Sequence, residues 1–139
     1  MVGPDSDGTL KDIKVMVQNL NLDVKFTGKL SKQEWVALSK TYNIFINTTN
    51  FDNMPLSVIE AMALGIPVVS TNVGGMPYLI KNNDNGILVT PNNAKDMAEA
   101  VKHLIENEQS RQKIIKSARA KVEQFDWKHI KHLWFRTLE

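Results

Sequence analysis

Two short runs of apolar residues, Tyr42–Asn47 and Ile66–Ser70, stand near the middle of the chain, and each ends in polar residues. A continuous apolar run of this length is typical of a strand that is covered on both faces of a parallel sheet. Between them lies a short helical pattern, which Pro55 can begin because a first-turn proline gives up no hydrogen bond. The stretch from Asn47 to Leu79 therefore predicts a strand, loop, helix, strand and glycine turn, the repeating unit of an α/β fold.

Upstream of this stretch, the pattern predicts two helices and two strands. Apolar residues spaced by three and four predict a helix over Thr9–Leu20 with one buried face. Met1–Gly3 is typical of the end of a buried strand, and Asp23–Thr27 predicts a short strand that Gly28 ends. Ser31 and Glu34 have the spacing of a capping box and predict the start of a second helix.

Downstream, Gly86–Val89 predicts a last strand, and Asn93 predicts the cap of a regularly spaced helix. The C-terminal third is helical and is interrupted by the sequence Phe-Asp-Trp at 125–127. Two apolar stripes flank the interruption; the first comprises Ile114, Ile115, Ala118, Val122 and Phe125, and the second Trp127, Ile130, Leu133, Trp134 and Leu138. Together these elements predict one domain, residues 1–139, with an α/β fold and a parallel sheet.

Composition narrows the classes of protein and of site. The chain of 139 residues is 42% hydrophobic and 23% charged, ordinary values for a globular domain. A net charge of +2 and the lack of a nucleic-acid motif argue against a nucleic-acid partner. The absence of cysteine excludes disulfides and thiolate metal sites. No apolar run approaches the roughly 20 residues that span a bilayer, and the N-terminus lacks a signal pattern, so a cytoplasmic location is predicted.

The loop after the first central strand is the predicted functional site. Ligands of open α/β sheets bind outside the carboxyl ends of the strands, where loops and helix N-termini meet. Asp52 lies in this loop and Glu60 in the second helical turn, so two carboxylates are expected at one helix start. Two interpretations of Asp52 remain open, because a carboxylate before a helix is also a common cap. Glu60 needs a partner, since a charge in an apolar helix is costly to bury alone.

The sequence DNMPLSVIEAMALGIPVVSTNVGGMPYLI, residues 52–80, closely resembles the signature of glycosyltransferase family 4, the retaining, GT-B type enzymes also called glycosyl transferases group 1. In that signature two acidic residues are separated by seven others, as Asp52 and Glu60 are here. The family usually has Glu at the first position, so Asp52 keeps the charge and shortens the reach by one methylene. The likeness extends through VKFTGKLSKQEWVALSKTYNIFIN and NGILVTPNNAKDMAEAVKHLIEN, which cover nearly the whole chain.

The resemblance implies a Rossmann-like, three-layer α/β/α domain, most of the C-terminal, nucleotide-sugar-binding half of a GT-B enzyme. It implies that Asp52 binds the transferred sugar, that Glu60 binds the ribose, and that Asn53, Met54, Pro55 and Leu56 face the diphosphate. The nucleotide base would lie near Lys29 and Leu30, although GKLS is equally typical of a simple turn. No cofactor and no metal are implied; the nucleotide sugar is the donor substrate.

The parent enzyme implied by the resemblance transfers a sugar with retention of configuration, in polysaccharide, lipopolysaccharide or glycolipid synthesis. A sugar or lipid-linked acceptor would bind the N-terminal domain of that enzyme. Neither this domain nor the family's Arg and Lys pair is present, so the chain is interpreted as an N-terminally truncated fragment that is inactive alone. If the family's strand order holds, Tyr42–Asn47 is an exposed edge. The fragment is then expected to self-associate or swap segments, or to pair Met1–Gly3 directly with that strand.

Other features leave alternatives open. Gly74 and Gly75 predict a tight turn rather than a phosphate cradle, since no GxGxxG or GK[ST] pattern is present. The last helix carries Lys128, Lys131 and Arg136 beside its tryptophans. This pattern is interpreted as a face that docks on another domain, while peripheral contact with the inner face of a membrane stays open. His103, His129 and His132 have no accompanying ligands at metal spacing, so no metal site is predicted.

Two further hypotheses for the function stand beside sugar transfer. One is a non-catalytic binding or interaction module that kept the nucleotide-sugar fold; Asp52 in place of Glu and the missing basic pair support it. The other is a GT-B-fold epimerase that acts on nucleotide sugars and shares the architecture. The match to the transferase signature favours transfer over both.

Overall fold

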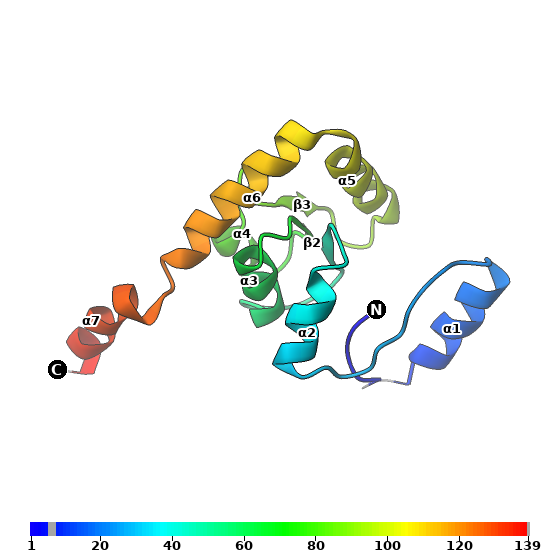
Figure 1. The fold of residues 1–139 in the computed structure, drawn as a ribbon, viewed down its shortest axis with the longest axis horizontal. Helices are drawn as coiled ribbons and strands as arrows, with labels where there is room; N and C mark the ends of the chain where they lie inside the picture. Colours follow the sequence, from blue (N-terminus) through cyan, green and yellow to red (C-terminus); the bar gives the residue numbers. More distant parts are fainter. Residues whose placement is uncertain (6–7, 139) are drawn as a thin grey trace. The chain divides into compact units, whose positions relative to one another are not determined.

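A computed structural model describes residues 1–5 and 8–138 of the chain (Figure 1). The residues group into two compact units, Met1–Leu38 and Ser39–Glu139. The first unit contains α1 (Leu10–Asn19) and most of α2 (Lys32–Ser39). The second contains the whole parallel sheet and the remaining helices, and it holds the hydrophobic core.

In the first unit, the predicted helix over Thr9–Leu20 is confirmed as α1, but the prediction of a buried face is wrong. No residue of α1 is buried, and Met16 is 61% exposed. A unit this short has little apolar surface with which to cover a helix, so the regular spacing produces a helix without a core around it.

The two predicted strands of the first unit do not form regular strands. Their backbones nevertheless pair, because the N–H of Thr27 donates to the carbonyl of Met1 at 3.1 Å and the N–H of Gly3 to that of Gly28 at 2.9 Å. The contact is too short for a ladder. The prediction of two regular strands here is therefore wrong, although the two segments lie side by side.

The capping box at the start of α2 is confirmed. The N–H of Ser31 donates to Oε2 of Glu34 at 2.7 Å, and the N–H of Glu34 donates to Oγ of Ser31 at 3.3 Å. The hydroxyl of Ser31, and then its N–H, bond to the Glu34 carboxylate and lower its pKa. This local cap fixes where α2 begins.

The second unit is built on a three-stranded parallel sheet with the order β1 (Phe45–Asn47), β2 (Val68–Thr71) and β3 (Ile87–Val89). Residue pairs such as Phe45 and Val68, or Val69 and Ile87, set the register. All three strands are shorter than the apolar runs that predict them. The strands begin late in these runs, since Ile66 and Pro67 precede β2 and remain buried without belonging to it.

Helices cover both faces of β2, as Figure 1 shows. Val68 faces a cluster with α3 (Leu56–Ala63), α4 (Met76–Leu79) and the second half of α6 (Glu108–Glu123). Val69, one residue on, faces a second cluster with α5 (Ala94–Glu106) and the first half of α6. Because successive residues of a strand point to opposite faces, this division defines a three-layer α/β/α arrangement. The predicted fold class is thereby confirmed.

The central strand β2 is fully covered, but β1 is not. Ile46 is 48% exposed and, among the described residues, β1 pairs with β2 alone. The prediction that the run Tyr42–Asn47 is covered on both faces is therefore wrong, whereas the prediction that it forms a sheet edge is confirmed within this unit. An apolar run alone does not distinguish a central strand from an edge strand.

The C-terminal helices follow the predicted stripes. Asn93 caps α5 by accepting a bond from the N–H of Asp96 at 3.1 Å, and Ile114, Ala118 and Val122 of α6 are buried. The chain bends after Glu123, and α7 (Trp127–Leu138) follows. No residue of α7 is buried, so its apolar stripe lies open.

Candidate functional site

The loop that joins β1 to α3 lies at the carboxyl ends of the parallel strands, where the sequence places the site. Asp52 is half-buried in this loop. No side chain caps α3, and Pro55 occupies the N-cap position, so the helix begins at Leu56, one residue later than the sequence predicts. Within the described part of the chain, the Asp52 carboxylate makes no hydrogen bond or ion pair. The interpretation of Asp52 as a helix cap is therefore wrong, and its oxygens are available to a ligand.

The backbone of this loop rests directly on the glycine turn after β2. The N–H of Gly75 donates to the carbonyl of Asp52 at 2.9 Å. A Cβ on Gly75 would lie 1.5 Å from the carbonyl oxygen of Asn53, and a Cβ on Gly74, whose φ is +52°, would lie 2.0 Å from that of Asp52. Two loops that follow neighbouring strands are thus locked together, which requires glycine at both positions. The prediction of a tight turn is confirmed, with the Asp52 loop as the segment that the turn approaches.

Polar side chains at the strand ends hold the same loop, and the sequence analysis missed them. Thr71 Oγ1 donates to the carbonyl of Thr49, and the side-chain amide of Asn47 donates to Oγ of Ser70 at 3.1 Å. Ser70 and Thr71 are almost fully buried. The available signal was the pair of polar residues that ends the apolar run of β2, since a buried hydroxyl requires a partner.

The residues predicted to face a diphosphate surround the start of α3. Asn53, Met54 and Leu56 are exposed, and Pro55 is half-buried. The carbonyl of Pro55 accepts the first helical bonds of α3, so the N–H groups before them have no carbonyl partner within the helix. These donors and the positive end of the helix dipole favour an anion.

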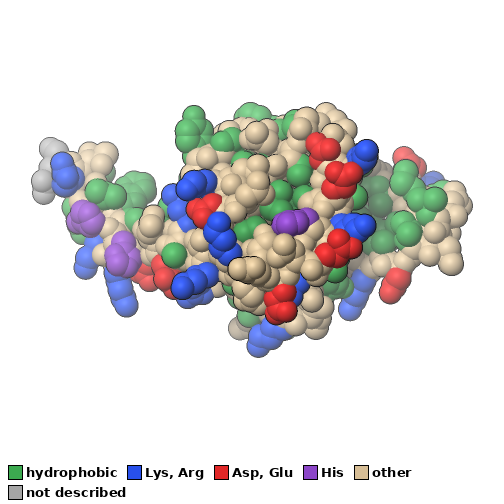
Figure 2. Space-filling model, turned by 90° about the horizontal axis from the view of Figure 1, so that it is seen from above, with side chains coloured by type: hydrophobic (Ala, Val, Ile, Leu, Met, Phe, Trp, Pro, Cys, Tyr) green, Lys and Arg blue, Asp and Glu red, His purple; other side chains and the backbone are tan. Residues whose placement is uncertain are grey.

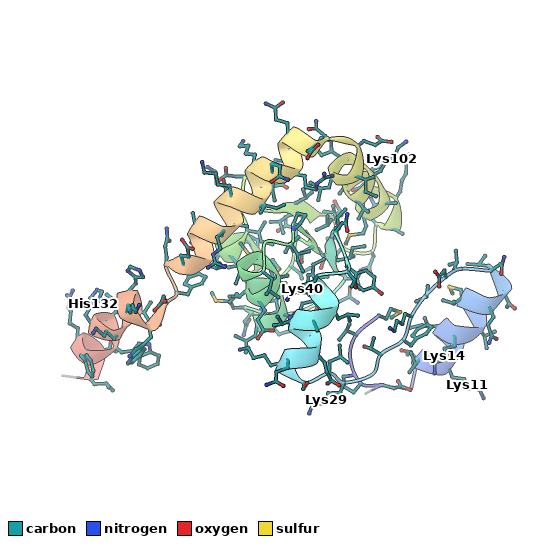
Figure 3. All side chains as sticks on the ribbon, in the orientation of Figure 1. Lys11, Lys14, Lys29, Lys40, Lys102 and His132 are labelled. Carbon is teal, nitrogen blue, oxygen red and sulfur yellow. The ribbon has the colours of Figure 1, made fainter. Side chains whose placement is uncertain are left out.

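Glu60 lies half-buried in the second turn of α3, on the same short helix as these donors. The structure therefore brings Asp52, the residues 53–56 and Glu60 together on one loop and helix. Lys29 and Leu30 belong to the other unit, in the turn that precedes α2 (Figure 3). There Lys29 is exposed and Leu30 half-buried, and Gly28 has the positive φ of +67° that the turn requires.

A cavity of about 350 Å³ lies elsewhere in the second unit, between α4 and α6, and none of the predicted site residues lines it. Tyr78, Lys81 and Lys121 are among the residues that do. At the predicted site, Asn53, Met54 and Leu56 are exposed at the surface of the unit. Among the described residues, no three His, Asp or Glu side chains gather in a way that could hold a metal ion.

The parallel sheet, the helices on both faces and the loop at the strand ends define a Rossmann-like α/β domain. The family model described as "Glycosyl transferases group 1" matches residues 1–121. The chain belongs to this family.

Curated relatives are similar over about three quarters of the chain. D-inositol 3-phosphate glycosyltransferase from Corynebacterium aurimucosum is 32% identical over 104 residues, which are 75% of this chain and 25% of that protein. Sulfoquinovosyl transferase SQD2 from Arabidopsis thaliana is 30% identical over 106 residues, 74% of this chain and 21% of that protein. The chain thus spans about a fifth to a quarter of the length of these relatives.

Solved structures show the same fold. The crystal structure of Anabaena Alr3699/HepE in complex with UDP-glucose matches with a TM-score of 0.88 and 27% identity, over 99% of this chain and 39% of that one. Sucrose-phosphate synthase from Thermosynechococcus elongatus matches with a TM-score of 0.85 and 26% identity, over 99% and 37%. Within the described residues, no helix has the length and apolar character needed to cross a bilayer.

Proposed function

We propose that this chain is the donor-binding domain of a longer enzyme that transfers a sugar from a nucleotide sugar to an acceptor. The observation that carries the proposal is the Asp52 carboxylate, which has no partner among the described residues and stands before the N-terminus of α3 at the end of β1. A carboxylate is a strong acceptor for sugar hydroxyls, and a helix N-terminus suits a diphosphate. The complex of Anabaena Alr3699/HepE with UDP-glucose supports a donor of this class.

In this proposal, Asp52 binds hydroxyls of the transferred sugar and Glu60 binds the ribose. The backbone groups of residues 53–56 face the diphosphate, and Asn53, Met54 and Leu56 supply the N–H donors because Pro55 has none. The helix dipole stabilises the diphosphate by roughly 0.3–1 kcal/mol when exposed. Lys29 and Leu30 contribute to the base site. These roles assign one end of an extended ligand to each carboxylate, with the helix start between them.

The proposed reaction retains the anomeric configuration and proceeds without a metal. Catalysis then depends on holding donor and acceptor in line and on stabilising the departing diphosphate. The acceptor, a sugar or a lipid-linked molecule, binds a separate N-terminal domain, and the product belongs to polysaccharide, lipopolysaccharide or glycolipid synthesis. Since the diphosphate would lack cationic partners on this chain alone, the 139-residue chain is expected to bind donors weakly and to show no transfer.

The test is a transfer assay on the full-length protein that carries this chain, with Glu60→Gln and Asp52→Asn. A hydrogen bond to a charged group contributes about 1.5–3 kcal/mol, so kcat/KM for the donor should fall roughly 10- to 100-fold in Glu60→Gln, and less in Asp52→Asn. Glu99→Gln is the matched control, because Glu99 is an exposed helical carboxylate of α5 that pairs with Lys95. Unchanged turnover and donor KM in Glu60→Gln would contradict the assignment.

Titration calorimetry of the 139-residue chain with UDP-, GDP- and ADP-sugars tests the domain assignment separately. Weak binding is expected. Sub-micromolar affinity, together with a full-length protein that shows no transfer, would instead favour a dedicated binding module.

A further inference from the structure

The cavity of about 350 Å³ between α4 and α6 has the volume of a small-molecule site, which is roughly 300–1,000 Å³. Residues of α4 and of the turn that follows it line one side. The side on α6 consists of residues spaced by three and four, which share one face of the helix, namely Ser117, Ala120, Lys121 and Gln124. Because the side chain of Ala120 is a single methyl group, the middle of this face leaves room for a ligand.

The turn after α4 is held in place by bonds within the chain. Oδ1 of Asn85 accepts a hydrogen bond from the N–H of Lys81 at 2.7 Å, and its side-chain amide donates to the carbonyl of Leu79 at 3.3 Å. Asn85 is buried, and Lys81 also pairs with Asp84 at 3.7 Å on the same turn. This side of the cavity therefore keeps its shape without a ligand, as pre-formed binding sites do.

The polar groups of the cavity include both donors and acceptors. The side chains of Ser117 and Gln124 make no hydrogen bond to another described residue, and a hydroxyl and an amide can each donate and accept. Lys121 adds a cationic donor and Asp84 an anionic acceptor. Figure 2 likewise shows acidic and basic side chains interspersed over one face of the second unit. Such a lining does not select a ligand of one charge, and it suits a neutral ligand with many hydroxyls.

Tyr78 adds an apolar face to this polar lining. Its side chain lines the cavity and is 83% exposed, so a ligand can cover its ring. A sugar ring presents C–H groups on its faces and hydroxyls at its edge, and covering an aromatic ring with the C–H face removes apolar area from water. We propose that the cavity binds a neutral oligosaccharide, with one sugar ring against Tyr78 and its hydroxyls on Ser117 and Gln124. The inference does not depend on the proposed donor site, because none of the residues of that site lines the cavity.

The test titrates the 139-residue chain with cellotetraose and with maltotetraose and follows the backbone amide NMR signals. At least one of them should produce saturable shifts at the lining residues, because both present the same apolar sugar faces. Tyr78→Ala should weaken binding on the order of tenfold through lost apolar contact, and Tyr78→Phe, which keeps the ring, should weaken it less. Gln124→Ala removes hydrogen bonds and should weaken binding roughly 2- to 12-fold. Ala120→Leu preserves the helix, fills the cavity and should abolish binding.

The matched control is Tyr42→Ala, because Tyr42 is the second of the two tyrosines, is 52% exposed and does not line the cavity. This variant should bind as the parent does. Tyr78, Ala120 and Gln124 are exposed, so their substitution leaves the core intact. The proposal is overturned if neither tetrasaccharide shifts the lining residues, or if Tyr42→Ala loses as much affinity as Tyr78→Ala. A response of the lining residues to inorganic phosphate alone would also overturn it and would identify an anion site instead.

Discussion

Replacing Gly75 with Ala tests whether the glycine turn holds the Asp52 loop. The φ of Gly75 is −83°, which any residue adopts, so the substitution adds no backbone strain and acts through contact alone. The new Cβ would lie 1.5 Å from the carbonyl oxygen of Asn53, and ordinary contact begins near 3.4 Å. The loop must therefore retreat by about 1.9 Å, the difference of these two distances.

Two costs add in this variant. Forcing an extra methyl group into a packed region costs typically 1–3 kcal/mol, and losing the hydrogen bond from Gly75 to Asp52 costs about 0.5–1.5 kcal/mol. We expect the free energy of unfolding to fall by roughly 2–4 kcal/mol, which a domain of ordinary stability survives. Urea unfolding measures this loss, and a donor titration of the full-length protein should show weaker binding because Asp52 moves with the loop.

The control for this experiment is Gly65→Ala, after α3. A Cβ there would meet one side-chain atom of Ile115 at 3.8 Å, an ordinary contact, but φ is +75°. This variant should lose about 1 kcal/mol through the backbone alone and keep donor binding. If Gly75→Ala is no less stable than Gly65→Ala, the close approach of the two loops is refuted.

Two further predictions concern α2 and the edge of the sheet. Hydrogen bonds from Ser31 lower the pKa of Glu34 below 4.5, so the capping box stabilises the fold above that pH and this stabilisation is lost as the pH falls. In Ser31→Ala, the free energy of unfolding, measured with urea, should therefore depend less on pH between about pH 5 and 3. Since the N–H of Phe45 donates to Pro67 at 2.9 Å, the next N–H, of Ile46, faces the open edge of β1. The chain should self-associate there, and Ile46 should gain protection from hydrogen exchange as concentration rises; a monomer at all concentrations in sedimentation would contradict this.

The features that the sequence predicted well are local ones. The box of Ser31 and Glu34 and the cap at Asn93 each depend on residues three positions apart, so a short stretch of sequence contains the whole interaction. The strand-helix-strand order of the second unit follows in the same way from the period of its apolar residues. Residues 52–80 also carried the family resemblance, which the match over residues 1–121 confirmed.

The features that the sequence did not predict depend on contacts between distant segments. The spacing of apolar residues in α1 contains no information about what covers the helix. The apolar run that forms β1 does not distinguish an edge strand from a central strand of the sheet. The partner of Gly75 lies more than twenty residues upstream, and the bond from Thr71 to Thr49 spans a similar separation. The fold class was thus within reach of the sequence, whereas the arrangement that holds Asp52 was not.

Asp52→Glu tests whether the shorter carboxylate is a tolerated variation or a fitted feature of the site. Asp52 is anchored through its backbone carbonyl, and its carboxylate has no partner within the described residues. Lengthening the side chain by one methylene therefore breaks no bond in the chain and restores the residue that the family usually carries. Transfer by the full-length protein should change by less than about tenfold, the effect of roughly 1.4 kcal/mol. If this substitution abolishes transfer while Glu99→Gln does not, the site accommodates only the shorter side chain of aspartate. The proposed contact between Asp52 and the sugar must then be reassigned.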